Sequence, residues 1–473
     1  MNKYKELIHE YIQVHKNDIV SELKELIKIQ SVRGESEDGA PFGKNCAEVL
    51  EKVKKLYEKE GFGTELNHNG GYLLSYYGKG ETSLGIFAHA DVVPVSDDWI
   101  LTKPFEPVEK DGYLIGRGSK DDKSGVIASL FCMKMIKELD IPLKSRLICF
   151  TGANEESGMN DIKNYLAEHK TPDFSLVPDT GFPLYRGNKG RITFTVKSTL
   201  KLSKGISISG GTGSSVIGDA EAVLPFNQVL FDEIFINCND KVSVKKIGET
   251  IIVKAKGIAQ HAAVPEGSIN GISLLAEAMM KCNSFEENDI EIFESLYKVS
   301  SCYYGECFEI ESQNEDFGKL TCVLTKITTE NGIINANFNV RYGTSIDIEN
   351  IKSNVSKNAV KSGWAIPEFG AYSVPHILPE NNPFVEKLLK FYKDYTHWEN
   401  ATSHVNAGGT YRQYLKNAVE IGTTNIWENP DGMLPGHGQV HQPDECISID
   451  GFLESIEIMV LMIVEIDRML AEK

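Results

Sequence analysis

Histidine and carboxylate residues recur in three short segments of the chain, at spacings that suit metal binding. The segments are His89-Ala90-Asp91, Asp121-Asp122 and Glu155-Glu156. Imidazole nitrogen and carboxylate oxygen are ligands that hold zinc in hydrolytic sites. Two later candidates, Asp179 and His441, make the set large enough for two metal ions. The residue types therefore predict a two-metal hydrolytic centre.

A two-metal centre lowers the pKa of a bridging water, and it needs a general base that is not fully engaged as a ligand. Adjacent side chains point in different directions, so one of Glu155 and Glu156 can bind a metal while the other faces the substrate. Asp91 can orient the imidazole of His89 through its second nitrogen. Taken singly, each residue has a commoner structural explanation, and for Asp122 this is the N-cap of a helix. The combination of the segments favours the metal centre.

Short apolar runs precede the candidates and predict strands that would position them. These runs are Leu84–Ala88 before His89, Arg146–Thr151 before Glu155, and Phe174–Val177 before Asp179. Helical spacing marks residues 2–30, 44–60 and 123–139. Strands that alternate with helices predict an α/β domain with a mostly parallel sheet. Ligands of such folds bind beyond the carboxyl ends of the strands, where all three candidates fall.

The pattern changes from about residue 186 onward and indicates a separate region. Strand-like alternation and helical spacing mix there, in residues 191–200, 206–209, 249–256, 269–282, 333–341 and 347–361. The first pattern then resumes, with helices at 383–395 and 450–471 and a strand at 418–422. We therefore predict a catalytic domain made of residues 1–185 and 378–473, with an inserted α+β lid domain at 186–377.

The composition excludes several classes of partner. A net charge of −18 argues against nucleic acid or an anionic membrane surface, since both need clustered positive charge. The N-terminal segment has no apolar core typical of a signal peptide, and no apolar run approaches the roughly 20 residues of a membrane span. The nine cysteines include one close pair, Cys302 and Cys307, for which we expect reduced thiols. These features favour a cytoplasmic protein.

Five motifs resemble those of the co-catalytic zinc peptidase family of aminoacylases, carboxypeptidases and dipeptidases. Residues 89–125, HADVVPVSDDWILTKPFEPVEKDGYLIGRGSKDDKSG, resemble the family's signature. NEESG at 154–158 and VPDTG at 177–181 look like the next two motifs. AGGTYRQYL at 407–415, HQPDE at 441–445 and the long insertion look most like the bacterial dipeptidase V branch, which is carnosinase-type and cleaves Xaa-His dipeptides.

The resemblance implies a role for each candidate ligand and for two helpers. Asp121 would bridge two zinc ions, with manganese or cobalt as alternatives that suit the same ligands. His89 and Asp179 would complete one ion, and Glu156 and His441 the other. Asp91 would orient His89, and Glu155 would be the general base. His437, close to His441 in number, is expected to be a bystander.

The resemblance also implies substrate contacts, two of them in the inserted region. His261, in GIAQHAAVPEGSINGI, resembles a histidine that stabilises the tetrahedral oxyanion, and Arg341, in NFNVRYG, an arginine that grips the substrate's C-terminal carboxylate. Gly409 and Thr410 are further substrate-binding candidates. Relatives carry an asparagine where this chain has GGTGSSVIGD at 210–219, with Ser215 nearest, which puts the substrate preference in doubt. The long insertion implies a monomer.

The expected activity is metal-dependent hydrolysis of dipeptides with free N- and C-termini, including β-alanyl or Xaa-His dipeptides. A water that bridges the metals would be the nucleophile, and Glu155 would take its proton. One alternative is an N-acyl-amino-acid deacylase, which would share every metal ligand. A remote alternative is a binding protein that has kept the fold without catalysis, but Glu155 and all five candidate ligands are present.

Overall fold

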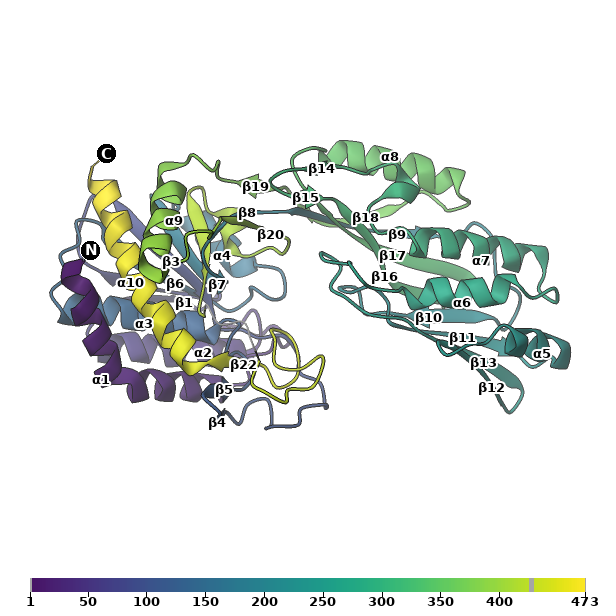
Figure 1. Ribbon diagram of the computed structural model, residues 1–473, viewed down its shortest axis with the longest axis horizontal. Coiled ribbons are helices and arrows are strands. Elements are labelled where there is room, and N and C mark those ends of the chain that lie inside the picture. The colour runs from purple at the N-terminus through teal and green to yellow at the C-terminus, as the bar shows by residue number, and fades with distance from the viewer. Residues whose placement is uncertain (1, 425–428, 473) are drawn as a thin grey trace. The chain divides into compact units, whose positions relative to one another are not determined.

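The computed structural model describes residues 2–424 and 429–472, which form two compact units (Figure 1). One unit comprises residues 1–188 and 377–473, and the other comprises residues 189–376. The predicted domain boundaries, after residues 185 and 377, lie beside these divisions. Among the helices of the described residues, none is long and apolar enough to cross a membrane.

A nine-stranded mixed sheet forms the centre of the first unit. Its order is β1 (Gly63–Asn67), β2 (Tyr72–Tyr77), β6 (Arg146–Gly152), β3 (Ser83–His89), β7 (Phe174–Thr180), β21 (Ala418–Gly422), β8 (Tyr185–Asn188) and β19 (His376–Ile377), with β20 (His404–Asn406) paired to β8. The strands β6, β3, β7 and β21 run parallel to one another. The outer strands β1 and β2 are antiparallel. The predicted α/β class is confirmed, and its parallel part is the centre of the sheet.

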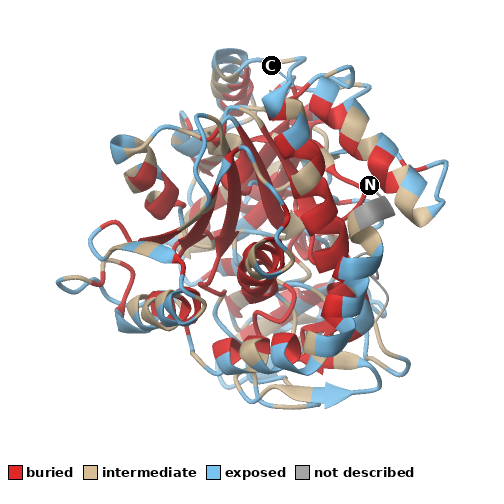
Figure 2. Ribbon diagram, turned by 90° about the vertical axis from the view of Figure 1, so that its left-hand side faces the viewer, coloured by how far each residue is buried: buried red, intermediate tan, exposed pale blue. Residues whose placement is uncertain are grey.

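Helices bury the strands of this sheet. They are α1 (Asn2–Ile27), α2 (Lys44–Lys59), α3 (Lys123–Glu138), α4 (Asn160–Glu168), α9 (Pro383–Thr396) and α10 (Ile449–Ala471). Figure 2 shows buried residues concentrated on the strands and on one side of most helices. The helix α3 is buried along most of its length, as its apolar sequence demands. Asp122 caps α3 as predicted, because its side chain accepts a hydrogen bond from the Gly125 N–H.

A small antiparallel sheet brings a late segment of the chain beside the start of α3. Its strands are β22 (Cys446–Ser448), β5 (Tyr113–Ile115) and β4 (Val108–Lys110). The segment that leads from β5 to α3 carries Asp121, and the segment just before β22 carries His441 and Glu445. Two parts of the sequence more than 300 residues apart are thus joined by backbone pairing.

The second unit is built on an eight-stranded antiparallel sheet. Its order is β12 (Val242–Ile247), β13 (Thr250–Lys256), β11 (Asp219–Pro225), β10 (Ser207–Gly210), β16 (Thr321–Glu330), β17 (Ile333–Tyr342), β9 (Gly190–Lys197) and β18 (Glu368–Ser373). The helices α5 (Gln228–Ile236), α6 (Gly271–Met280), α7 (Glu287–Ser300) and α8 (Ile348–Lys361) accompany it. The predicted inserted α+β domain is confirmed as a fold class.

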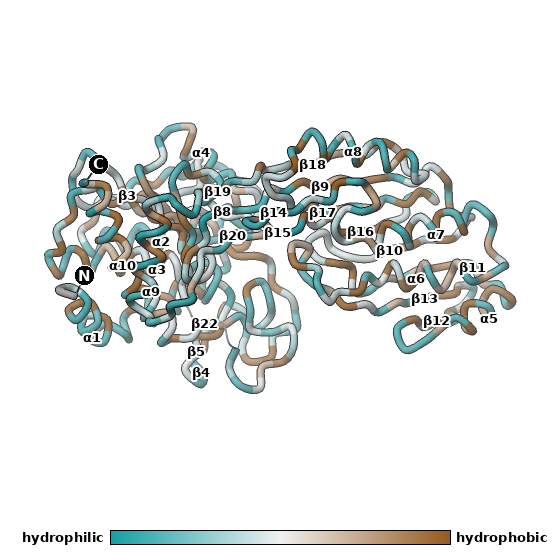
Figure 3. The backbone as a smooth tube through the Cα atoms, turned by 45° about the horizontal axis from the view of Figure 1, so that its top comes forward, coloured by the Kyte–Doolittle hydropathy of each residue, from teal (hydrophilic) through white to brown (hydrophobic). Residues whose placement is uncertain are grey.

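Alternating side chains give the second sheet two different faces. Phe338, Val340 and Tyr342 of β17 belong to the hydrophobic core, while Asn339 and Arg341 between them project to the opposite face. Figure 3 shows the corresponding mixture of hydrophobic and hydrophilic residues along the strands of this unit. One face of the sheet therefore carries a row of polar side chains.

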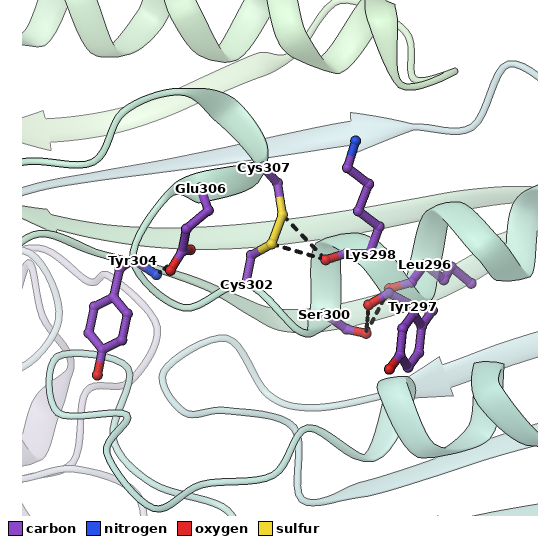
Figure 4. Close-up of a disulfide and its surroundings, with 8 residues drawn as sticks. All are labelled: Leu296, Tyr297, Lys298, Ser300, Cys302, Tyr304, Glu306 and Cys307. Atoms are coloured by element: carbon purple, nitrogen blue, oxygen red, sulfur yellow. Dashed lines mark hydrogen bonds between the residues drawn. A yellow bond between two sulfur atoms is a disulfide. The ribbon is translucent and has the colours of Figure 1, made fainter.

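Cys302 and Cys307 form a disulfide, so the prediction of reduced thiols is wrong (Figure 4). The chain leaves α7 and turns back through a short 3-10 helix (Glu306–Phe308). This turn brings the two Cα atoms to 6.2 Å, within the range that a disulfide spans. The other seven cysteines are free. The short sequence separation showed that the two cysteines are close along the chain, but it did not show the turn that joins them. The expected cytoplasmic location stays a prediction.

Candidate metal centre

Three parallel strands deliver the first candidates to one edge of the central sheet. His89 is the last residue of β3, and it lies opposite Gly152 at the end of β6. Glu155 follows β6 by three residues, and Asp179 lies near the end of β7. The carboxyl ends of parallel strands meet at the same edge of a sheet, so the predicted positions at strand exits bring these side chains together.

The first group of ligand atoms consists of His89, Asp121 and Asp179. The Nε2 atom of His89 lies 3.1 Å from Oδ1 of Asp121 and 3.5 Å from Oδ1 of Asp179. Each of the three residues offers one atom within 4.8 Å of the other two. His89 is almost fully buried, at 1% exposure, so the group is shielded from bulk water on the imidazole side.

The second group shares Asp121 with the first and adds Glu156 and His441. The Nε2 atom of His441 lies 3.1 Å from Oδ2 of Asp121 and 3.1 Å from Oε1 of Glu156. The two oxygens of Asp121 thus face different groups, as a bridging carboxylate requires. All five predicted ligands are brought together, in two groups of three.

Hydrogen bonding at His89 fits a cation better than a protein donor. Its Nδ1 atom lies 3.0 Å from the carbonyl oxygen of Asp91, which can only accept, so Nδ1 carries the proton. Its Nε2 atom then presents a lone pair, and it is buried without a hydrogen bond among the described residues. The nearest atoms are carboxylate oxygens, which are also acceptors. A cation is the partner that satisfies all of them, and nitrogen and carboxylate oxygen suit zinc.

Electrostatics at the centre also favours positive charge. Burial raises the pKa of Glu156 to about 7, with Asp121 acting in the same direction. Burial likewise raises the pKa of Asp179 to about 6. Burial would lower the pKa of His441, but hydrogen bonds to Asp121 and Glu156 raise it to about 11. The carboxylates destabilise one another, and cations between them would relieve that repulsion.

Glu155 stands beside the ligands without being held by one of them. Glu155 is 8% exposed, and its Oε1 atom has no hydrogen-bond partner among the described residues. Burial, more than any neighbour, raises the pKa of Glu155; His89 opposes this shift, and Asp179 adds to it. A raised pKa makes this carboxylate a stronger proton acceptor than an ordinary glutamate.

Asp91 fixes the backbone that carries the two glutamates. Its Oδ1 atom accepts a hydrogen bond of 3.0 Å from the Glu155 N–H, and its Oδ2 atom accepts one of 3.2 Å from the Glu156 N–H. The carboxylate lies 3.5 Å from Nδ1 of His89, farther than the Asp91 carbonyl oxygen. Asp91 therefore contacts His89, as predicted, and its backbone carbonyl is nearer to the imidazole than its carboxylate. The carboxylate also holds the turn that carries Glu155.

Glu445 supports the centre and was not among the predicted site residues. Its Oε1 atom accepts hydrogen bonds from the N–H groups of Lys120 (2.9 Å) and Asp121 (3.0 Å). Its Oε2 atom accepts from Gly118 N–H and from the Arg117 guanidinium. Glu445 is fully buried and so holds the backbone of the shared ligand Asp121 in place. The place of Glu445 in the HQPDE motif could have drawn attention to it, but its spacing in the sequence did not assign it a role.

His437 contacts another carboxylate and not the two metal groups. Its Nδ1 atom lies 2.8 Å from Oδ2 of Asp444, whose Oδ1 atom accepts from the N–H groups of Ile100 and Leu101. The histidine belongs to neither group of candidate ligands. The contact agrees with its predicted place as a bystander.

Thr410 is tied into a buried polar cluster near the central sheet. Its hydroxyl donates a hydrogen bond to Glu420, which also accepts from Asn188 and Asn406. Thr410 is 4% exposed, and its hydroxyl also accepts from the Arg412 N–H. These contacts give Thr410 a structural role, and substrate binding by Gly409 and Thr410 stays a prediction.

His261 and Arg341 both lie in the second unit. The Nδ1 atom of His261 accepts a 3.3 Å hydrogen bond from the Ala263 N–H, which leaves the Nε2 atom to carry the proton and donate. Ser215 and His261 form an isolated β-bridge. The serine nearest to the position where relatives carry an asparagine is therefore a backbone neighbour of His261. Arg341 is 7% exposed, and its Nε atom donates to Oδ1 of Asn339 at 3.1 Å.

Comparison with known proteins assigns the family. The model of peptidase family M20/M25/M40 matches residues 85–465, which include every candidate metal ligand. The chain belongs to this family. It is therefore a hydrolase that acts on peptide bonds, and the resemblance found in its motifs is confirmed at that level.

Curated relatives cover nearly the whole chain. A protein of Bacillus subtilis (strain 168) is 27% identical over 470 residues, which are 96% of this chain and 98% of its own. A protein of Staphylococcus haemolyticus (strain JCSC1435) is 26% identical over 463 residues, which are 93% of this chain and 95% of its own. Both names contain the word dipeptidase.

Solved structures show the same fold at lower identity. The di-peptidase Dug1p of Saccharomyces cerevisiae has a TM-score of 0.60 with 13% identity, covering 99% of both chains. Human carnosine dipeptidase 1 has a TM-score of 0.59 with 13% identity, covering 98% of this chain and all of that chain (100%). The two-domain architecture is thus shared, while the details of the substrate are not carried over.

Proposed function

We propose that the protein is a metal-dependent dipeptidase acting on dipeptides with a free N-terminus and a free C-terminal carboxylate. The observation that carries the proposal is the pair of ligand groups that share Asp121, together with the Glu155 carboxyl group, which interacts electrostatically with residues of both groups. The relatives that span the whole chain and are named as dipeptidases support the substrate class. Zinc is the first candidate metal, and manganese or cobalt would suit the same ligands.

The proposed mechanism assigns proton transfer to Glu155. Two cations held by the five ligands would supply Lewis acidity, lowering the pKa of a water and polarising the scissile carbonyl. Glu155 takes the proton of the attacking water and passes it to the leaving amine. Asp91 keeps this carboxylate in position through the backbone N–H of Glu155. Burial raises the pKa of Glu155 above that of an ordinary glutamate, which favours proton uptake by this carboxylate.

Two residues are proposed to contact the substrate's charge, as the family resemblance implies. The Nε2–H group of His261 is the proposed donor to the oxyanion, since its Nδ1 atom already accepts a hydrogen bond. The guanidinium of Arg341 is the proposed partner of the C-terminal carboxylate, for which its fork geometry is suited. The long insertion remains the basis for the expectation of a monomer.

A matched substrate set tests the proposal. The purified protein, loaded with zinc or manganese, is offered Ala-Ala, β-Ala-His, Ala-Ala-Ala and N-acetyl-alanine, each with and without a chelator. Chelator-sensitive cleavage confined to the two dipeptides is the expected result. Cleavage of N-acetyl-alanine alone would instead identify a deacylase, and no cleavage by a protein with two bound metals would favour a binding protein.

A further inference from the structure

The AGGTYRQYL segment at 407–415 contacts the turn that carries the two glutamates of the metal centre. It forms a short 3-10 helix (Tyr411–Tyr414) in the first unit. The hydroxyl of Tyr411 donates a hydrogen bond of 2.5 Å to Oδ2 of Asp161, which is near the start of α4. Both residues are fully buried. A motif singled out by its sequence thus meets the end of the turn that begins at the carboxyl end of β6.

The carboxylate of Asp161 holds the other end of the same turn. Its Oδ2 atom accepts a 2.7 Å hydrogen bond from the N–H group of Asn154, and its Oδ1 atom accepts one of 2.8 Å from the N–H group of Ile162. Asn154 is itself fully buried. Because Asn154 immediately precedes Glu155, Asp161 fixes the backbone on the N-terminal side of the proposed base.

The hydroxyl of Tyr411 helps to keep this buried carboxylate charged. Burial, together with the charge of Asp91, raises the pKa of Asp161 to about 7, while the hydrogen bonds from Tyr411 and Asn154 oppose that shift. Hydrogen bonds to a carboxylate favour its ionised form, which is the better acceptor for the Asn154 N–H group. Loss of the tyrosine hydroxyl therefore weakens the anchor of the turn.

Gly152, the last residue of β6, leaves room for this pair of side chains. A Cβ atom at Gly152 would lie 1.9 Å from the hydroxyl oxygen of Tyr411 and 2.3 Å from Oδ2 of Asp161, which is too close for non-bonded atoms. Gly152 lies opposite His89 in the sheet, and the Tyr411 ring meets the His89 imidazole edge-on, with ring centroids 6.3 Å apart. The pair therefore lies at the edge of the sheet where the metal ligands gather.

We propose that Tyr411 and Asp161 are positioning residues for the general base, which gives the AGGTYRQYL segment a role in catalysis. This assignment rests on the proposed function, in which Glu155 transfers the proton. Asp91 holds the N–H group of Glu155, and Asp161 holds the N–H group of the residue before it. Two buried carboxylates thus fix successive peptide groups of the turn, and Tyr411 fixes the second carboxylate. A misplacement of about 1 Å at a reacting group can cost roughly 100-fold in rate.

Tyr411→Phe, which removes one hydroxyl and keeps the ring, tests the proposal in the metal-loaded protein. The variant should still bind two metal ions, counted by elemental analysis. Its kcat for Ala-Ala should fall by roughly 10–100-fold, while KM changes by less than about twofold. A loss in kcat at constant KM is expected when the base is displaced and the substrate is still bound.

Tyr165→Phe is the matched control. Tyr165 is a buried tyrosine of the same hydrophobic cluster as Tyr411, and it lies on α4, the helix that also carries Asp161. Its hydroxyl donates to the carbonyl oxygen of Lys170, beyond the C-terminal end of that helix. The control therefore loses one hydroxyl and one hydrogen bond away from the glutamates, and it should keep the kcat of the wild type.

Amide hydrogen exchange of the peptide 153–160 gives a measurement that does not depend on activity. Exchange in this peptide should be faster in Tyr411→Phe than in the wild type, and unchanged in Tyr165→Phe, because only the first variant weakens the anchor of the turn. Adding Tyr411→Phe to Asp161→Ala should cause no further loss of kcat, since the hydroxyl acts through the carboxylate. Both single phenylalanine variants keep the carboxylate, so their comparison decides the proposal even if Asp161→Ala does not fold.

Four results would overturn the proposal while leaving the dipeptidase in place. Equal kcat in the two phenylalanine variants would make the Tyr411 hydroxyl merely structural, and a raised KM at constant kcat would make it a substrate contact. Loss of a metal ion from Tyr411→Phe would make it a support of the ligands, and additive losses with Asp161→Ala would mean that it acts by another route. If the wild type cleaves no dipeptide, the proposed function fails instead, and the exchange comparison alone decides whether Tyr411 holds the turn; equal exchange in the two variants would then overturn the anchor as well.

Discussion

Replacing Glu445 with glutamine should destabilise the first unit although the side chain keeps its size. Glutamine has one acceptor where glutamate has two, but the four donors around Glu445 surround both of its oxygens. If the amide oxygen faces Asp121 and Lys120, the NH₂ group meets Arg117 and Gly118. If the amide is reversed, the NH₂ group meets the other pair. Either orientation leaves two buried donors facing another donor.

The size of the effect follows from the burial of Arg117. Its side chain is 2% exposed and that of Glu445 is fully buried. Removing one partner of a buried ion pair costs about 3–5 kcal/mol, because the remaining charge is left uncompensated. An unsatisfied N–H group would add about 1–3 kcal/mol, although such costs are not additive. We expect a loss of about 4 kcal/mol, which corresponds to roughly 10 °C in the melting temperature of a unit of this size.

Urea unfolding and thermal melting of Glu445→Gln measure this loss, with Glu106→Gln as the matched control. Glu106 also pairs with a cation, Lys103, but their side chains are 65% and 77% exposed, so the control should change stability by less than about 1 kcal/mol. The zinc affinity of the variant then distinguishes the two orientations of the glutamine amide. The affinity should fall by roughly 10–100-fold if the Asp121 N–H group loses its acceptor, and it should stay unchanged if Arg117 loses its acceptor instead. Equal unfolding midpoints for the two variants would refute the assignment of Glu445 as the compensating charge.

Three further predictions concern the base, the oxyanion donor and the disulfide. Glu155→Gln should bind both metals, counted by elemental analysis, yet lose about 10²–10⁴-fold in kcat; a rate near that of the wild type would remove Glu155 as the base. His261→Ala should lower kcat by about 10²–10³-fold with little change in KM, whereas a change in KM alone would contradict an oxyanion contact. In the unreduced, denatured protein, seven thiols should titrate, and nine after reduction. The double variant Cys302→Ser/Cys307→Ser should lose about 2 kcal/mol of stability, as expected for a short closed loop, and nine titratable thiols before reduction would exclude the disulfide.

The ligand positions could be predicted because strand ends are visible in the sequence. The apolar run that forms β3 stops at His89, and the run that forms β7 stops at Asp179. A buried parallel strand must be apolar, so the first polar residue after it marks the edge of the sheet. Since neighbouring parallel strands share that edge, several such residues meet without any knowledge of long-range contacts. The positions of His89 and Asp179 were therefore within reach of local patterns, whereas Asp121 and His441 lie beside the short strands β5 and β22 and received their roles from the family resemblance.

The residues that support the site could not be predicted, because their positions depend on long-range contacts and not on local patterns. Glu445 lies 324 residues from Asp121 along the chain, and no periodicity links them. Their contact depends on the pairing of β22 with β5, which are three residues each. Strands this short leave almost no pattern, because one alternation of apolar and polar residues is common by chance. The Cys302–Cys307 disulfide was missed in a similar way, since the turn that closes it is set by packing of the surrounding unit.

Asp91 shows why local patterns find a residue more readily than its full role. Its position two residues after His89 suggested a contact with the imidazole, which the backbone carbonyl makes at 3.0 Å. Its carboxylate is 64 residues from Glu155 in sequence but accepts the N–H groups of both Glu155 and Glu156. Asp91 thus holds the imidazole of His89 through its backbone carbonyl, and the backbone of Glu155 and Glu156 through its side chain. An Asp91→Ala change would release the N–H groups of both glutamates and leave the backbone contact to His89, so it should lower turnover although the first ligand keeps its nearer support.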